Sequence, residues 1–125
     1  MREIGERLAS PALSAQRGAA PPSFMYVGSF TTPERGHGDG ITVFQRTGAA
    51  PWTQIQVVKD LENPSFLITD RQGHVLYAVH SDGDRVSSYR IDPATGRLSL
   101  LNHQATGGQN GVHLSIDGTG TWLVA

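Results

Sequence analysis

Short runs of apolar and β-branched residues, separated by polar and glycine-rich turns, make up most of this 125-residue sequence. Three such runs lie at residues 25–30, 40–45 and 52–58, and the last alternates apolar with polar side chains as a half-buried strand does. Further runs follow at residues 65–69, 75–79, 86–91 and 97–104, and a last pair begins at residues 112 and 122. We therefore predict an all-β chain of short antiparallel strands joined by tight turns.

An internal repeat groups these strands. Residues 63–78 (NPSFLITDRQGHVLYA) recur 47 positions later as residues 110–125 (NGVHLSIDGTGTWLVA), with Asn, Leu, Asp, Gly, Leu and Ala kept in register. Two further strands lie between the copies, so each repeat holds four strands, which is the content of a β-propeller blade. We predict a first blade that lacks its inner strand, a complete second blade and the start of a third.

The first 24 residues carry no strand pattern, and Ala-Ala-Pro-Pro-Ser at residues 19–23 would end any helix before the first strand. We predict that residues 1–24 form a disordered or non-native N-terminal extension, with Met25 as a plausible native start. Residues 25–125 would then form an incomplete β-propeller of about two blades.

Charge and composition exclude several functional classes. Ten Lys and Arg residues against eleven Asp and Glu residues give a formal net charge of −1, which offers no basic surface for nucleic acid or an anionic membrane. The sequence has no cysteine, no secretory signal pattern and no apolar run of eighteen residues. We therefore predict no nucleic-acid partner, no membrane partner and a location in the cytoplasm.

Several short motifs together resemble the lactonase family of seven-bladed β-propellers. The resemblance rests on YVGSFT at residues 26–31, NPSFL at 63–67, LYAV at 76–79, IDPATGRL at 91–98 and HLS at 113–115. Members of this family include propeller-type 6-phosphogluconolactonases and carboxy-muconate cyclases. A complete member would need roughly 330 residues, so the resemblance implies that this chain is an N-terminal fragment of such a propeller.

The resemblance implies that the full form hydrolyses a sugar lactone such as 6-phosphogluconolactone, and that the fragment alone is inactive. Two alternatives stay open: a cyclase or lactonising enzyme of the muconate type, and a non-catalytic binding or scaffold propeller. The chain departs from the family at His80-Ser81, where Asn-Glu is usual, and at Gly111, where proline is usual. The arginine and acidic residues of the cyclase-like pocket are expected in later blades.

Strand direction alternates within a blade, so the loops after the second strand and after the outer strand share one face of the propeller. Polar residues on this face are our candidates for the site: Arg35, His37, Asn63, His80, Asp82, Asp84, Arg85, Asn110 and His113. The opposite face carries Arg71, His74, Asp92 and Arg97.

We predict that His113 is the catalytic general base, because it begins an inner strand and an imidazole can activate water near neutral pH. The alternative is a solvated or hydrogen-bonded histidine at a strand start. Substrate-binding residues would be Arg35, His37, His80 and Asn110, although a flexible, solvated hairpin loop is the better explanation of Arg35 and His37. No histidine spacing fits zinc and Asp82 and Asp84 lack the later ligands of a calcium loop, so we predict no metal and no cofactor. Unpaired strand edges in the first and third units predict self-association.

Overall fold

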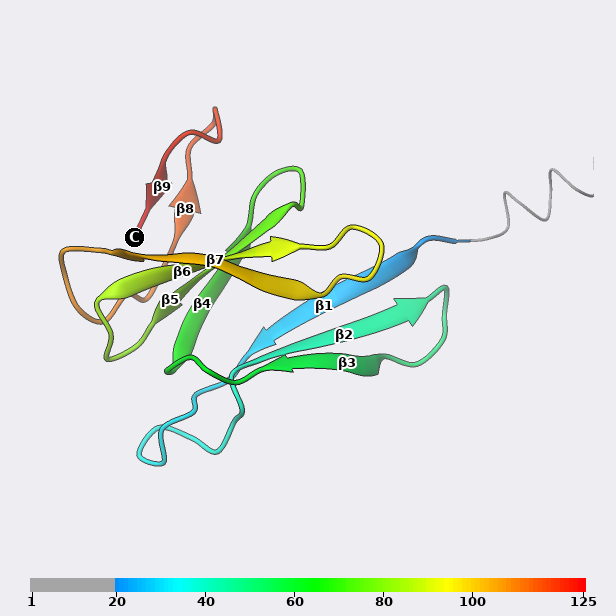
Figure 1. Cartoon of the computed structure of the whole chain (residues 1–125), viewed down its shortest axis with the longest axis horizontal. Helices are drawn as coiled ribbons and strands as arrows, with labels where there is room; N and C mark the ends of the chain where they lie inside the picture. Colours follow the sequence, from blue (N-terminus) through cyan, green and yellow to red (C-terminus); the bar gives the residue numbers. More distant parts are fainter. Residues whose placement is uncertain (1–19) are drawn as a thin grey trace, which may run out of the picture.

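The computed structural model describes residues 20–125, which form three antiparallel sheets (Figure 1). The prediction of an N-terminal extension therefore falls largely on residues 1–19, which lie outside the described residues. The fold is all-β, as the alternation and the turns predicted, and one of the sheets has four strands.

The first sheet has the strand order β1-β2-β3. Its strands are β1 (Pro22–Gly28), β2 (Ile41–Thr47) and β3 (Thr53–Val58). The assignment of residues 22–24 to the extension was wrong, because β1 begins at Pro22 and pairs there with Thr47. Proline is tolerated at the first residue of a strand, and Phe24 lies against Gly96 in the turn between β6 and β7, where an added Cβ would come 2.2 Å from the phenyl ring.

The second sheet is the complete blade that the repeat predicted, with the order β4-β5-β6-β7. Its strands are β4 (Pro64–Thr69), β5 (Val75–His80), β6 (Arg85–Ile91) and β7 (Leu98–Ala105). The third sheet is a short hairpin of β8 (Ser115–Ile116) and β9 (Leu123–Val124). His113, which we predicted to begin an inner strand, lies two residues before β8 because only two residue pairs of this hairpin are hydrogen bonded.

The turns of the two repeats are built in the same way, which explains the conserved spacing of their aspartates. Asp70 accepts hydrogen bonds from the backbone N–H groups of His74 and Val75 through Oδ1. Forty-seven residues later, Asp117 accepts from the N–H groups of Thr121 and Trp122 through the same atom. These bonds hold the pKa of the Asp117 carboxyl well below its usual range, with the Thr119 hydroxyl as the largest cause. The repeat in the sequence is therefore a repeat of turn chemistry.

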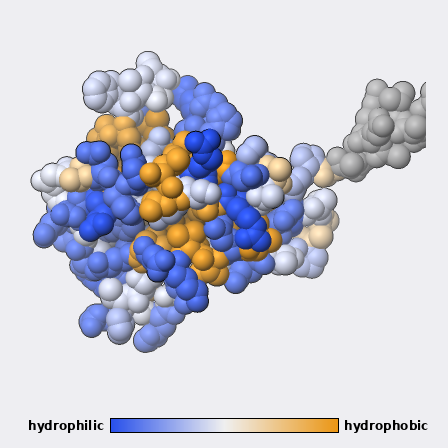
Figure 2. All heavy atoms as spheres, viewed as in Figure 1, coloured by the Kyte–Doolittle hydropathy of each residue, from blue (hydrophilic) through white to orange (hydrophobic). Residues whose placement is uncertain are grey.

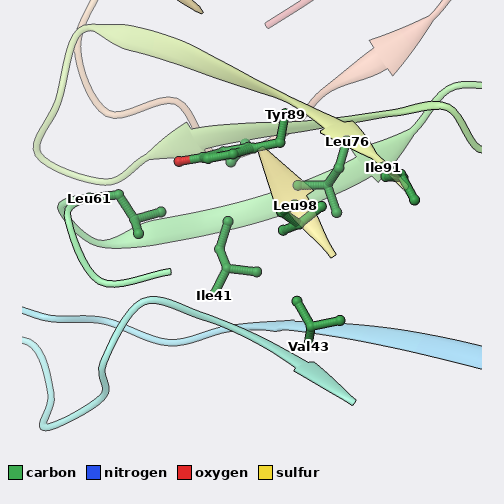
Figure 3. Packing of buried hydrophobic residues seen from close by; sticks show 8 residues of the cluster. Ile41, Val43, Leu61, Leu76, Tyr89, Ile91 and Leu98 are labelled. Carbon is green, nitrogen blue, oxygen red and sulfur yellow. The ribbon is translucent and has the colours of Figure 1, made fainter. Parts of the chain in front are cut away.

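The core lies between the first and second sheets (Figure 3). Ile41 and Val43 alternate along β2 and are both fully buried against the face of the second sheet that carries Leu76 and Ala78. A second cluster, on the other face of the second sheet, joins Val79 and Val86 to Leu114 and to partly buried residues that include Leu123. The second sheet is thus the central layer, with β1–β3 on one side and the β8–β9 hairpin on the other (Figure 1).

In the space-filling view, hydrophobic residues form a band through the middle of the molecule, with hydrophilic residues on both sides (Figure 2). Within residues 20–125, no helix is long and apolar enough to cross a membrane.

Candidate functional site

His113 is an exposed side chain held beside an aromatic ring. The imidazole centroid lies 4.6 Å from the centroid of Phe66 on β4, with the two rings tilted by 47°. Leu114, the next residue, is only 1% exposed and anchors the segment in the core. The Ser65 hydroxyl donates to the Gly111 carbonyl at 2.7 Å and ties the same segment to β4. The structure therefore places His113 next to the inner strand of the second sheet, with its ring open to solvent.

Asn63 and Asn110, at equivalent positions of the repeat, connect neighbouring sheets. The Asn63 Oδ1 accepts from the backbone N–H groups of Thr31 (2.9 Å) and Thr32 (3.0 Å) in the loop after β1. The Asn110 Oδ1 accepts in the same way from the N–H group of Asp82 (2.7 Å), in the loop after β5. Both asparagines have positive φ, 36° and 60°, a conformation that asparagine tolerates better than most residues. We call these two contacts the asparagine staples.

The staple uses polar groups of Asn110 that a substrate would otherwise bind. Its Oδ1 accepts from Asp82, and its backbone N–H group donates to the Gly83 carbonyl at 2.9 Å. Asn63 is completely buried, and its side-chain amide also donates to the Thr32 hydroxyl at 2.9 Å. The sequence repeat carried the signal for this shared structural role.

Arg35 forms a bidentate pair with Asp82. The Nε–Oδ2 distance is 2.8 Å and the Nη2–Oδ1 distance is 2.6 Å, which is the geometry that a planar guanidinium favours with a carboxylate. The Arg35 hydrogen bond is the largest cause that lowers the pKa of Asp82. The Arg35 side chain is 47% exposed, so it remains in contact with solvent while it is paired.

His80 lies elsewhere, and it is buried with both ring nitrogens occupied. Its Nδ1 is 2.6 Å from the Glu62 carbonyl oxygen, and its Nε2 is 2.6 Å from the Ser87 hydroxyl. Burial is the main cause that lowers the pKa of His80, against a smaller raising effect of the bond to Glu62. His37 is exposed in the loop between β1 and β2.

The predicted residues therefore occupy four places. Arg35 and Asn110 meet at Asp82, whereas His37, His80 and His113 are each held in different surroundings. Sequence reasoning missed Ser87 and His103, which join His80 in a chain of hydrogen bonds. Ser87 and His103 are brought together by the β6–β7 register, in which they pair next to a β-bulge. A sequence pattern does not reveal the position of this bulge, so the contact could not be predicted.

A cavity of about 370 Å³ opens beside His80, where the β3–β4 connection meets the second sheet. It is lined by residues 60–62 of the β3–β4 connection, by His80 and residues 82–85, and by Ser87, His103 and Gln109. We call it the inter-blade cavity. Its lining does not include His113, so the cavity and the predicted base lie apart. Among residues 20–125, no three His, Cys, Asp or Glu side chains gather around a point that suits a metal ion.

The family of the chain follows from comparison with known proteins. The model of the family described as "Lactonase, 7-bladed beta-propeller" matches residues 24–125. The chain belongs to this lactonase family. Relative to the family, the structure is a partial propeller of one four-stranded blade flanked by a three-stranded sheet and a hairpin.

Two curated relatives are 6-phosphogluconolactonases. The protein of Bacillus subtilis is 33% identical over 95 residues, which are 74% of this chain and 26% of the relative. The protein of Formosa agariphila is 35% identical over 104 residues, which are 79% of this chain and 29% of the relative. The chain thus spans little more than a quarter of the length of these relatives.

Solved structures show the same architecture. A crystal structure of a candidate 6-phosphogluconolactonase from Bacteroides fragilis superposes with a TM-score of 0.65 and 30% identity, over 76% of this chain and 27% of that one. A second, from Bacteroides uniformis, gives a TM-score of 0.65 and 28% identity over 76% and 28% of the two chains. Both solved chains therefore match about three quarters of this chain with little more than a quarter of their own length.

The two staples provide a matched test of burial. We expect Asn63→Gly to lower the free energy of unfolding by about 1–3 kcal/mol more than Asn110→Gly, because it leaves the amides of Thr31 and Thr32 without an acceptor inside the protein. Glycine keeps the positive φ accessible at both positions, so the comparison isolates the side-chain bonds. Urea unfolding followed by far-ultraviolet circular dichroism measures the difference. An equal decrease in the free energy of unfolding in both variants would show that the buried staple stabilises the fold no more than the exposed one.

Proposed function

We propose that this chain forms part of a hydrolase that opens a sugar lactone such as 6-phosphogluconolactone, with His113 as the general base. Membership of the lactonase family and the names of the two curated relatives support the substrate class. The observation that carries the assignment of His113 is its exposed ring, held against Phe66 beside the inner strand. Inner strands of a propeller face the central channel, where ligands bind.

The chemistry needs one base and one activated water. The imidazole of His113 would take a proton from a water molecule as its oxygen forms a bond to the lactone carbonyl carbon. The resulting tetrahedral intermediate breaks the bond between that carbon and the ring oxygen, and the ring oxygen leaves as a hydroxyl after receiving a proton. The products are a carboxylic acid and a free hydroxyl group, with no other reactant.

The proposed substrate contacts need to be weighed by what each side chain already binds. Arg35 is paired with Asp82 but stays exposed to solvent, and His37 is exposed, so these two remain the proposed contacts for the polar groups of a substrate. His80 has both ring nitrogens in hydrogen bonds, and the Asn110 Oδ1 is used by the staple. For these two residues the protein contacts favour a structural role. A cytoplasmic location is part of the same proposal.

The activity test needs a complete ring, because a channel-mouth site takes groups from several blades. We expect the 125-residue chain alone to hydrolyse 6-phosphogluconolactone no faster than its His113→Ala variant. In a chimera where residues 24–125 replace the aligned part of the Bacillus subtilis relative, His113→Ala should lower kcat about a hundredfold to ten-thousandfold.

The matched control is His74→Ala, because His74 lies in the turn between β4 and β5 and should leave kcat unchanged. Each chimera is first checked for a folded circular dichroism spectrum. Equal turnover of the two folded variants would remove His113 from the mechanism. A folded but inactive parent chimera would favour the binding or scaffold alternative.

We also propose that the chain associates with copies of itself through its third sheet. Val112, Trp122 and Val124 are 72%, 71% and 60% exposed, and β9 is an edge strand within the described residues. Exposed apolar residues on a strand edge favour pairing with another chain.

The test compares two tryptophans of different exposure. Trp122→Ser should shift the sedimentation profile of the chain toward monomer, because it removes the more exposed of the two indole rings. Trp52→Ser should leave the profile unchanged, because Trp52 is 36% exposed and lies under the Arg46 guanidinium. A wild-type chain that sediments as a monomer at high micromolar concentration would rule out this association.

A further inference from the structure

Three polar side chains form a continuous hydrogen-bonded chain beside the inter-blade cavity. His80 on β5 bonds to Ser87 on β6, and the Ser87 hydroxyl lies 2.9 Å from Nδ1 of His103 on β7. His80 is 4% exposed and Ser87 is completely buried, whereas His103 is exposed. This row of hydrogen bonds therefore leads from solvent at His103 to a buried imidazole at His80. Its inner end is the Glu62 carbonyl, in the segment that joins the first sheet to the second.

The carbonyl at the inner end fixes the direction of every hydrogen bond in the chain. Because the Glu62 oxygen can only accept, Nδ1 of His80 must carry a hydrogen. In neutral His80 the Nε2 atom is then an acceptor, so Ser87 donates its single proton to it. The Ser87 oxygen is left to accept from Nδ1–H of His103. In this state each member of the chain has a partner.

Additional protons have a defined route and a defined limit. A proton that binds at His103 can pass through the Ser87 hydroxyl to Nε2 of His80, with the hydroxyl turning to donate back to His103. One extra proton therefore keeps every bond. A second extra proton would make both imidazoles donors to Ser87 and place two like charges on either side of one oxygen atom, which is unfavourable at this distance.

Charged groups of both signs face this chain. The β3–β4 connection contributes Asp60 and Glu62, the β5–β6 loop contributes Asp82 and Asp84, β6 contributes Arg85, and β7 contributes His103. Asp82 is already paired with Arg35, and Tyr89 on β6 stays neutral because burial raises the pKa of its phenol. The Glu62 carboxylate favours a charged His80, whereas His103 and Arg85 oppose it. Within the described part of the chain, the His80 ring bonds to the Glu62 carbonyl and to Ser87, and no buried carboxylate bonds to it directly.

We propose that His80, Ser87 and His103 form a proton-sensitive latch, which ties the second sheet to the connection from the first sheet and loosens when a second proton makes both imidazoles cations. The neutral latch closes one side of the inter-blade cavity through the Glu62 carbonyl. The second proton places like charges on either side of the Ser87 oxygen, whose own hydroxyl hydrogen then has no acceptor in the network, and the protein relieves this cost by releasing the β3–β4 connection from His80.

The direction of the pH dependence follows from burial. The pKa of His80 is lowered in the folded protein, so at mildly acidic pH the unfolded chain binds more protons than the folded one. Folded stability is therefore complete at pH values above the ordinary histidine pKa of about 6.5 and falls as the pH drops below it. The loss continues down to the lowered pKa of the folded state.

The test uses the full 125-residue chain and three asparagine variants. Asparagine in place of His80 can still donate to the Glu62 carbonyl but does not titrate, and His74→Asn is the control for removing an exposed histidine. Between pH 6.5 and 5, the unfolding constant of the wild type should rise by up to about tenfold per pH unit relative to His80→Asn. His74→Asn should follow the wild type.

Nitrogen NMR of the wild type reports on the latch even if a variant fails to fold. We expect neutral His80 to carry its hydrogen on Nδ1 at pH 7.5, and its protonation midpoint to move to higher pH in His103→Asn, where the like charge is removed. A hydrogen on Nε2, an unchanged midpoint in His103→Asn, or parallel stability curves for wild type and His80→Asn would each overturn the proposal.

Discussion

The packing of the first sheet against the second is the contact on which the rest of the structure depends. Ile41 and Val43 of β2 are both fully buried there, and the blade to which they belong has only three strands in the described part of the chain. The Asn63 staple fixes the loop after β1 at the edge of this interface, and the same loop then brings Arg35 to Asp82. The positions of Asn63, Arg35 and Asp82 therefore depend on how the apolar surfaces of the first and second sheets pack together.

Much of this architecture could be predicted from local patterns. Alternation of apolar and polar residues gave the strands, and the recurrence of residues 63–78 gave the four-stranded blade, because Asp70 and Asp117 make the same turn. The start of β1 was missed because its first residues, Pro22 to Phe24, have no alternation of their own. They join the strand through pairing with β2 and contact with Gly96, which are tertiary effects.

The candidate site was less accessible to sequence reasoning. The face of a blade on which a residue lies does not show whether its side chain is available to a substrate. Asn110 and His80 lie on the expected face, but both are hydrogen bonded to other protein atoms. The link between Ser87 and His103 depends on a β-bulge and on residues 16 positions apart. The role of His113 as a base stays a prediction; it was based on the start of an inner strand, and the structure places the residue two positions before β8, in contact with Phe66.

Amide hydrogen exchange at Thr31 and Thr32 tests the central claim most directly, namely that the two sheets meet through the Asn63 staple. These amides lie in a loop and have no partner in a strand, and their acceptor is the Asn63 side chain. If the sheets are stapled, both amides exchange about as slowly as that of Ala78 in the core of β5. Exchange at the rate of an open loop, while Ala78 remains protected, would show that the sheets do not meet in this way.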